Sequence, residues 1–165
     1  MDLFKTAKKN KKFLILIFCL SLVLNFLFFH FFLKQNKDYW RGDTPWYDEI
    51  AVQIANGNGI KTFDGIDSYY RVPGYSIFLA ACYKIFNFDK ISAILIQIIL
   101  SAFIPILIFF LSICLFPSNL LLAKLSSFLF CFNFGNWLYS GVLMSESIFL
   151  LLFLIFLILF LKGIK

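Results

Sequence analysis

The run FLILIFCLSLVLNFLFFHFFL, from Phe13 to Leu33, decides the fold class of this chain. Its 21 residues are apolar except for Ser21, Asn25 and His30. At about 1.5 Å per residue, a helix of this length reaches about 31 Å and crosses a hydrocarbon core about 30 Å thick. The sequence therefore predicts a membrane-spanning helix over 13–33.

A cluster of lysines directly precedes this run and sets its expected orientation. Lysines beside an apolar segment are typical of the cytoplasmic side. The run is too long for a removable signal peptide, and no cleavage site follows it. No aromatic pattern accompanies the lysines, so we expect no nucleic-acid partner. We expect 1–12 to be the basic cytoplasmic N-terminus of a plasma (inner) membrane protein, with the residues after Leu33 on the extracytoplasmic face.

The composition excludes most other protein classes. Hydrophobic residues make up 61% of the 165 residues, charged residues 15%, and Phe alone contributes 24. A soluble domain of this length buries only part of its surface and cannot hide so much apolar area, and disordered chains are poor in such residues. The four cysteines each lie within an apolar run and form no disulfide framework. This is the composition of a polytopic membrane protein.

The rest of the chain consists of one long polar stretch followed by further apolar runs. The polar stretch, 34–90, is expected to be an outer loop with interfacial helices at about 45–56 and 75–88. The second of these reaches only about 21 Å, too little to cross a membrane. Together these features predict an all-α integral membrane protein with about four transmembrane helices and two short interfacial helices. The remaining segments are transmembrane helices over 91–116, 120–138 and 147–161, a short outer loop at 139–146 and a cytoplasmic end at 162–165.

The first interfacial helix carries clear start and stop signals. Thr44 is the expected N-cap and Pro45 the first helical residue. Asp48 and Glu49 then fall in the first turn, where the helix dipole favours acidic side chains. The Asn-Gly-Asn-Gly sequence at 56–59 is expected to end the helix.

Three short motifs in the expected outer segments form an ordered set. Their order, spacing and expected sidedness resemble the GT-C superfamily of integral-membrane glycosyltransferases. The branch concerned includes dolichyl-phosphate-mannose-protein mannosyltransferases and bacterial lipid A sugar transferases. Ser76 departs from that pattern, since a proline is usual there. In chain order the motifs are Asp43, Tyr47, Ala51 and Gly57, then Arg71, Pro73, Gly74 and Tyr75, and finally Ser145 and Glu146.

The resemblance implies an inverting hexosyl- or pentosyltransferase. Such an enzyme moves a sugar from a polyprenyl-phosphate-linked lipid donor to an acceptor hydroxyl on the outer face. Because these enzymes are much longer, we expect the N-terminal portion of a GT-C-like fold, a truncated or partial enzyme. Its site would be completed by further helices or a partner chain, and membrane lipid would surround it. The resemblance assigns Asp43 and Glu146 as catalytic residues and Arg71, Tyr47 and Tyr75 as substrate-binding residues. Tyr70 is added to the substrate-binding residues because its ring could stack on a sugar.

The residue types fit that chemistry. Asp43 lies just before a helix, whose positive end favours the ionised form that a general base needs. Arg71 offers a planar fork that matches phosphate oxygens, and Glu146 is suited to orient an acceptor or a metal. We expect no required cofactor, although a divalent cation remains open and its ligands unknown. His30 has no companion at ligand spacing and is interpreted as an interfacial residue.

Each of these residues also has a plainer interpretation. Asp43 could cap a helix, Arg71 could pair with Asp64 or Asp67, and Glu146 could be half of an ion pair. The alternative functions are a small polytopic membrane interaction protein and a transporter fragment, both without catalysis. A transporter would need acidic residues near mid-membrane or broken helices, whereas the carboxylates of this chain are expected at interfaces or in loops, which counts against it.

Overall fold

The computed structural model describes residues 3–37, 39–67 and 72–164. Those residues form an all-helical structure without β-strands, apart from an isolated bridge between Lys61 and Asp67. Three helical segments among them are long and apolar enough to span a membrane. The prediction of an all-α membrane protein is therefore confirmed, whereas the count of four transmembrane helices is not.

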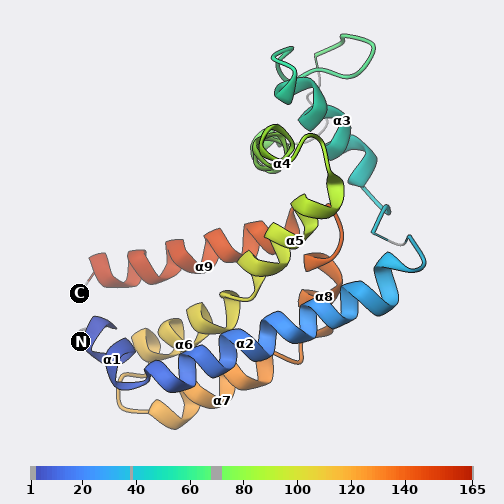
Figure 1. Ribbon diagram of the computed structural model, residues 1–165. Coiled ribbons are helices and arrows are strands. Elements are labelled where there is room, and N and C mark those ends of the chain that lie inside the picture. The colour runs from blue at the N-terminus through green and yellow to red at the C-terminus, as the bar shows by residue number, and fades with distance from the viewer. Residues whose placement is uncertain (1–2, 38, 68–71, 165) are drawn as a thin grey trace.

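The first of these segments is Lys11–Lys34, close to the predicted 13–33. It follows a short helix, α1 (Leu3–Lys9), and consists of α2 (Lys11–Phe28) and a π-helical continuation, η1 (Phe29–Lys34). Figure 1 shows α2 and η1 running the length of the bundle, from the chain termini toward the opposite end of the molecule.

The second segment, Lys90–Leu115, contains a break where Pro105 predicts a kink. Helix α5 (Lys90–Ser101) ends before the proline and α6 (Ile104–Leu115) begins just before it. Proline has no N–H to donate to the carbonyl four residues earlier, and its ring collides with that carbonyl. The hydroxyl of Ser127 donates to the Pro105 carbonyl oxygen at 2.7 Å, so the broken turn is held against the next helix of the chain.

The third segment is α9 (Glu146–Gly163), which includes the predicted 147–161. The predicted helix over 120–138 is instead two helices, α7 (Leu120–Phe130) and α8 (Phe134–Ser140). Asn133 causes the break, because its side-chain oxygen accepts from the backbone N–H of Asn136 at 2.8 Å and starts a new helix. Figure 1 shows that the two helices nevertheless follow the bundle from the terminal end to the far end of α2.

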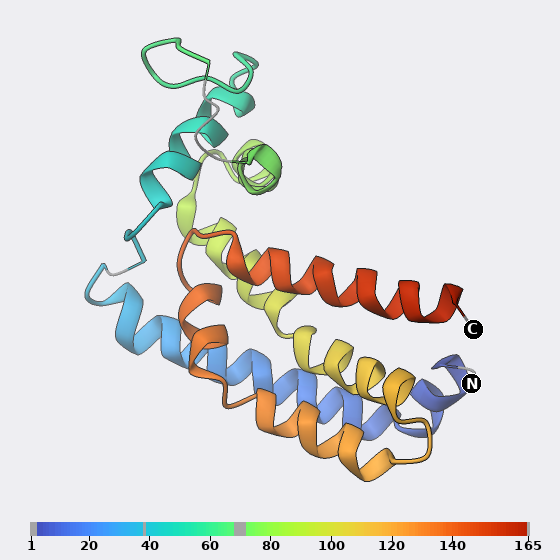
Figure 2. The same cartoon turned by 180° about the vertical axis from the view of Figure 1, so that it is seen from behind.

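The two helices of the predicted outer loop lie at the opposite end from the termini. They are α3 (Thr44–Ala55) and α4 (Pro73–Ile85), against the predicted 45–56 and 75–88. Figures 1 and 2 both show α4 end-on while α2 and α9 lie in the plane, so α4 runs crosswise to the long helices. Its 13 residues reach only about 20 Å, which is too short to span a membrane.

The main hydrophobic core joins these two helices to the bundle. Leu79 and Tyr83 of α4 pack with Ile94 and Ile98 of α5, and all four are fully buried. The turn between α8 and α9 belongs to the same core through Val142 and Leu143. At the start of that turn, a Cβ on Gly141 would lie 2.5 Å from a methyl carbon of Leu33, so a larger residue there would require the Leu33 side chain to shift.

Candidate functional site

The first and third sequence motifs meet in space. The hydroxyl of Thr44, at the start of α3, donates to the carbonyl oxygen of Leu143 at 3.2 Å. The hydroxyl oxygens of Tyr47 and Ser145 lie 3.2 Å apart in a second hydrogen bond. These bonds join residues nearly 100 positions apart in the chain, so they fix α3 against the start of α9.

A groove of about 500 Å³ opens beside these hydrogen bonds. Tyr47 and Tyr75 form one wall, with their rings 5.0 Å apart and nearly perpendicular. Ser145 also lines the groove, together with Ile148, Phe149 and Leu152 of α9. The groove therefore combines hydroxyl groups with an apolar surface that suits a hydrocarbon chain.

Glu146 is the first residue of α9 and follows the groove residue Ser145. Its Oε2 atom is buried and has no hydrogen-bond partner among the described residues. The positive end of the α9 dipole stabilises a carboxylate at this position. A buried carboxylate oxygen without a partner is costly, and such atoms in native structures call for an explanation. A ligand hydroxyl or water at this atom would satisfy it.

Tyr75 is held as a neutral hydrogen-bond donor beside this carboxylate. Burial raises its pKa well above the ordinary value, and the nearby Tyr83, Cys82, Glu146 and Tyr47 add to the effect. The Tyr75 hydroxyl donates to Oε1 of Gln97 at 2.6 Å. The ring, rather than the hydroxyl, is therefore what Tyr75 presents to the groove.

Asp43 occupies the N-cap position of α3, which corrects the predicted N-cap Thr44. The side chain of Asp43 makes no capping hydrogen bond, and Thr44 instead bonds across to Leu143. The preceding Gly42 has a left-handed φ of 57°, and a Cβ there would lie 3.4 Å from the sulfur of Met144. The backbone leading into Asp43 therefore passes close to the turn that carries Ser145 and Glu146.

Gln97 is a site residue that the sequence analysis missed. It is fully buried in α5, and its Nε2 donates to the carbonyl oxygens of Tyr139, Ser140 and Val142 at 2.7–3.2 Å. The same amide accepts from Tyr75. It therefore positions both the groove wall and the turn that leads to Glu146. The sequence did contain a signal for this role: Gln97 is a lone glutamine within the apolar run 91–116. Polar groups in membrane segments need hydrogen-bond partners, so such a residue is expected to hold other parts of the chain.

Asp48 has a structural role that differs from the predicted one. It lies beyond the first turn of α3, as does Glu49, so the expected interaction of both with the helix dipole is wrong. Asp48 is buried, accepts from the Tyr83 hydroxyl and forms an ion pair with Lys90 at 2.9 Å. The ammonium of Lys90 also lies 3.9 Å from the centre of the Trp40 ring. The lysine at the start of α5 is thus neutralised by the loop helices.

The remaining predicted residues contribute less to the observed site. Arg71 and Tyr70 lie outside the described residues, and so does the alternative pairing of Arg71 with a loop acid. His30 is exposed and stacks on Phe26 with the ring centres 6.1 Å apart. Within the part of the chain that the structure describes, no three His, Cys, Asp or Glu side chains lie close enough to hold a metal ion.

Comparisons with known protein families, with curated proteins and with solved structures found no match. The function is therefore argued from the groove, its hydroxyl groups and the residues that position them. The structure brings together Tyr47, Tyr75, Ser145 and Glu146, with the backbone of Asp43 nearby.

Proposed function

We propose that this chain transfers a sugar from a polyprenyl-phosphate-linked donor to an acceptor hydroxyl, as part of a GT-C-like enzyme. The observation that carries the proposal is the groove between α3, α4 and α9. Ser145 lines this groove, and the next residue, Glu146, has a buried side-chain oxygen without a hydrogen-bond partner among the described residues. Both candidate catalytic residues, Asp43 and Glu146, stand at helix N-termini, where a carboxylate is stabilised.

The mixed polar and apolar character of the groove supports a lipid-linked sugar as the donor. A polyprenyl chain would lie along Ile148, Phe149 and Leu152 of α9, and the sugar would lie against the rings of Tyr47 and Tyr75. Val72, which follows Arg71 in the sequence, also lines the groove. This placement supports a role for the Arg71 guanidinium at the donor phosphate.

The proposed reaction is a direct displacement at the anomeric carbon. The carboxylate of Asp43 takes the proton of the acceptor hydroxyl, and the acceptor oxygen forms a new bond to that carbon. The bond from the anomeric carbon to the phosphate oxygen breaks, and polyprenyl phosphate leaves with the electron pair. Glu146 accepts a hydrogen bond from the acceptor. One displacement inverts the configuration at the anomeric carbon.

The proposal includes a four-crossing topology. Helices α7 and α8 together would form the fourth crossing as a broken helix, with 34–90 and 139–146 on the extracytoplasmic face. Further helices or a partner chain would complete the donor cavity around the open side of the groove.

An activity assay tests the chemistry. Membranes containing the chain are given a radiolabelled polyprenyl-phosphate sugar, and transfer to an acceptor is measured for Asp43→Asn and Glu146→Gln. Loss of a general base is expected to lower the rate by about 10²–10⁴. Asp64→Asn, at an exposed loop position, is the matched control and is expected to keep the activity. Unchanged transfer in Asp43→Asn would refute the assigned base.

A binding assay tests the donor site even if a partner chain is needed for turnover. A benzophenone amino acid is placed at Phe149, which lines the groove, or at Phe156, an exposed residue further along α9. Irradiation with radiolabelled polyprenyl phosphate is expected to label the chain from position 149 and not from position 156. Equal labelling from both positions would favour the alternative of a small membrane interaction protein without a donor site.

A further inference from the structure

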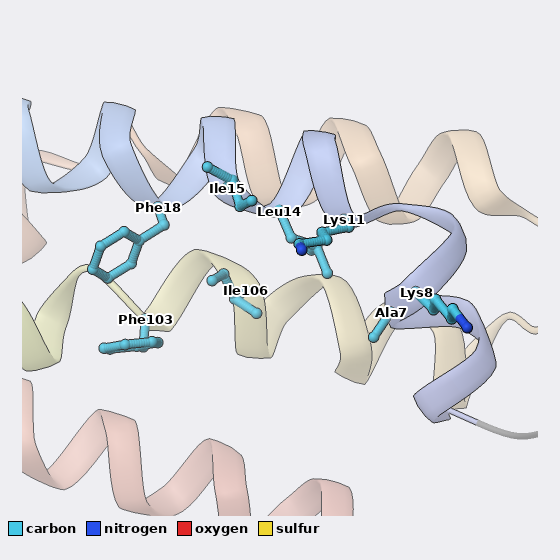
Figure 3. Close-up of a pocket in the computed structure, with 8 residues that line it drawn as sticks. All are labelled: Ala7, Lys8, Lys11, Leu14, Ile15, Phe18, Phe103 and Ile106. Carbon is cyan, nitrogen blue, oxygen red and sulfur yellow. The ribbon is translucent and has the colours of Figure 1, made fainter.

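A second groove lies at the terminal end of the molecule, far from α3 and α4 (Figures 1 and 3). It has a volume of about 450 Å³ and lies between α1, α2 and α6. Six of its eight lining residues are apolar, and the other two are Lys8 and Lys11. Nothing in the proposed glycosyl transfer uses this groove.

The groove has a closed apolar end and an open basic end. The rings of Phe18 and Phe103, whose centres are 4.7 Å apart, close the apolar end. Figure 3 shows Lys11 reaching over the groove beside Leu14 and Ile106, with Lys8 at the far end on α1. Phe18 lies seven residues after Lys11, which is about 10 Å along the helix axis.

The depth of the groove indicates which molecules can reach it. Lys11 is the first residue of the first candidate span, so it lies near headgroup depth in a membrane. Ile15 and Phe103 are about half exposed and belong to segments that would lie in the hydrocarbon layer. Acyl chains fill that layer, so the apolar floor of the groove faces lipid.

The charge of the open end selects among lipids. Lys8 and Lys11 are exposed. The acidic residues that the structure describes lie at 43–89 and at 146, toward the opposite end of the molecule (Figure 1). The ammonium groups of Lys8 and Lys11 therefore have no carboxylate from 43–89 or from Glu146 beside them. The negative charge of a phosphate group complements their positive charge. Basic pockets beside membrane helices bind anionic headgroups in this way.

We propose that this groove binds one anionic phospholipid. One acyl chain lies along Leu14, Ile15 and Ile106 toward the Phe18–Phe103 pair, and the headgroup phosphate contacts Lys8 and Lys11. The side-chain amide of Asn10 donates to the carbonyl of Thr6 at 3.0 Å, in the turn between α1 and α2. This turn sets the relative position of the two lysines.

Native mass spectrometry tests the proposal on the full chain. The delipidated protein in mild detergent is offered an equimolar mixture of phosphatidylglycerol and phosphatidylcholine, and the retained lipids are counted. A lysine near an anionic headgroup contributes a factor of about five in affinity, so two lysines are expected to favour phosphatidylglycerol about 25-fold. Lys8→Gln/Lys11→Gln is expected to abolish that preference.

The matched control is Lys9→Gln/Lys12→Gln. It removes the same charge from exposed neighbours that do not line the groove, and it is expected to keep the preference. Ala7→Phe, which places a ring in the groove, is expected to reduce retention of both lipids while all the lysines remain. Circular dichroism confirms that each variant keeps its helical content.

Three results would overturn the assignment. Equal loss of preference in the two double-lysine variants would mean that diffuse charge, rather than a site, attracts the lipid. Absence of any preference for phosphatidylglycerol over phosphatidylcholine in the unmodified chain would remove the role of the phosphate. A lipid-free dimer that Ala7→Phe dissociates would show that a second copy of the chain covers the groove.

Discussion

Gln97 is the residue on which the geometry of the candidate site depends most. A buried amide in a membrane segment has no water with which to exchange hydrogen bonds, so every partner that it loses remains unsatisfied. Here one side chain holds the Tyr75 hydroxyl and three backbone carbonyls of the chain that leads to Glu146. Tyr75 and Glu146 thus share one support, although they come from different segments.

Replacing Gln97 by methionine is expected to destabilise the fold and to loosen the site. Methionine has a similar volume but cannot form the four hydrogen bonds, and each buried group left unsatisfied costs about 1–3 kcal/mol. Thermal unfolding in detergent, followed by circular dichroism, measures the loss. Ile99→Met, at a half-exposed position on the same helix, is the control and should unfold close to the parent temperature. Equal unfolding temperatures for the two variants would contradict the role given to Gln97.

The candidate residues were chosen from signals that are local in the sequence, and their roles stay predictions. Tyr47, Tyr75 and Glu146 were chosen as candidates, and the structure places them at or beside one groove. The importance of Gln97 and the Asp48–Lys90 ion pair was not predictable in the same way. Lys90 lies 42 positions after Asp48, and the carbonyl groups that Gln97 contacts lie 42 or more positions after it. Tyr75 lies 22 positions before Gln97. No local sequence pattern encodes contacts between residues so far apart.

At the scale of elements, the helices are best predicted where residues with strong turn preferences bound them. Helix α3 begins at Thr44, beside Pro45, and ends at Ala55, before Asn56 and Gly57, within a residue or so of the expected bounds. The break between α7 and α8 was missed because the run 120–138 is apolar enough to suggest one helix. A single capping side chain, Asn133, overrides that pattern.

Helix α5 begins with a capping carboxylate whose effect depends on pH. Asp89 accepts hydrogen bonds from the backbone N–H groups of Ile91 and Ser92 and from the Ser92 hydroxyl. The Ser92 hydroxyl, followed by the backbone bonds, lowers the pKa of Asp89 from its ordinary 3.8. Because the pKa is lower in the folded state, the stabilisation is complete above the unfolded value of 3.8. It is lost as the pH falls through the folded value.

Asp89→Asn is expected to remove this pH dependence. Asparagine caps helices about as well as aspartate but carries no titrating group, so the variant should unfold near the parent temperature at neutral pH. On acidification to about pH 3, the parent chain should lose part of the cap energy, about 1 kcal/mol at most, whereas the variant should not. Unfolding curves at the two pH values measure the difference. A parallel loss in both proteins would assign the acid sensitivity to other carboxylates.

At the scale of the whole molecule, the described acids and the two termini lie at opposite ends (Figure 1). The lysines of α1 and α2 and Lys162 near the end of α9 lie at the terminal end. From the positive-inside rule we predict that this end lies in the cytoplasm and the α3–α4 end outside. Several basic residues also lie on the α3–α4 end, among them Lys84 in α4 and Lys90 in α5, and Lys90 is neutralised there by its ion pair with Asp48.

This arrangement predicts the labelling of single cysteines in intact cells. In a variant without the four native cysteines, Asn58→Cys and Ser145→Cys are expected to react with a membrane-impermeant maleimide. Both positions belong to the α3–α4 end, and neither is fully buried. Ser118→Cys, in the exposed turn between α6 and α7, is the control and should react only after the membrane is permeabilised.

Labelling of position 58 without position 145 would place Asp43 and Glu146 on opposite faces of the membrane. A single donor lipid could not then meet both carboxylates, and the proposed glycosyl transfer would fail while the lipid groove beside Lys8 and Lys11 remained unaffected.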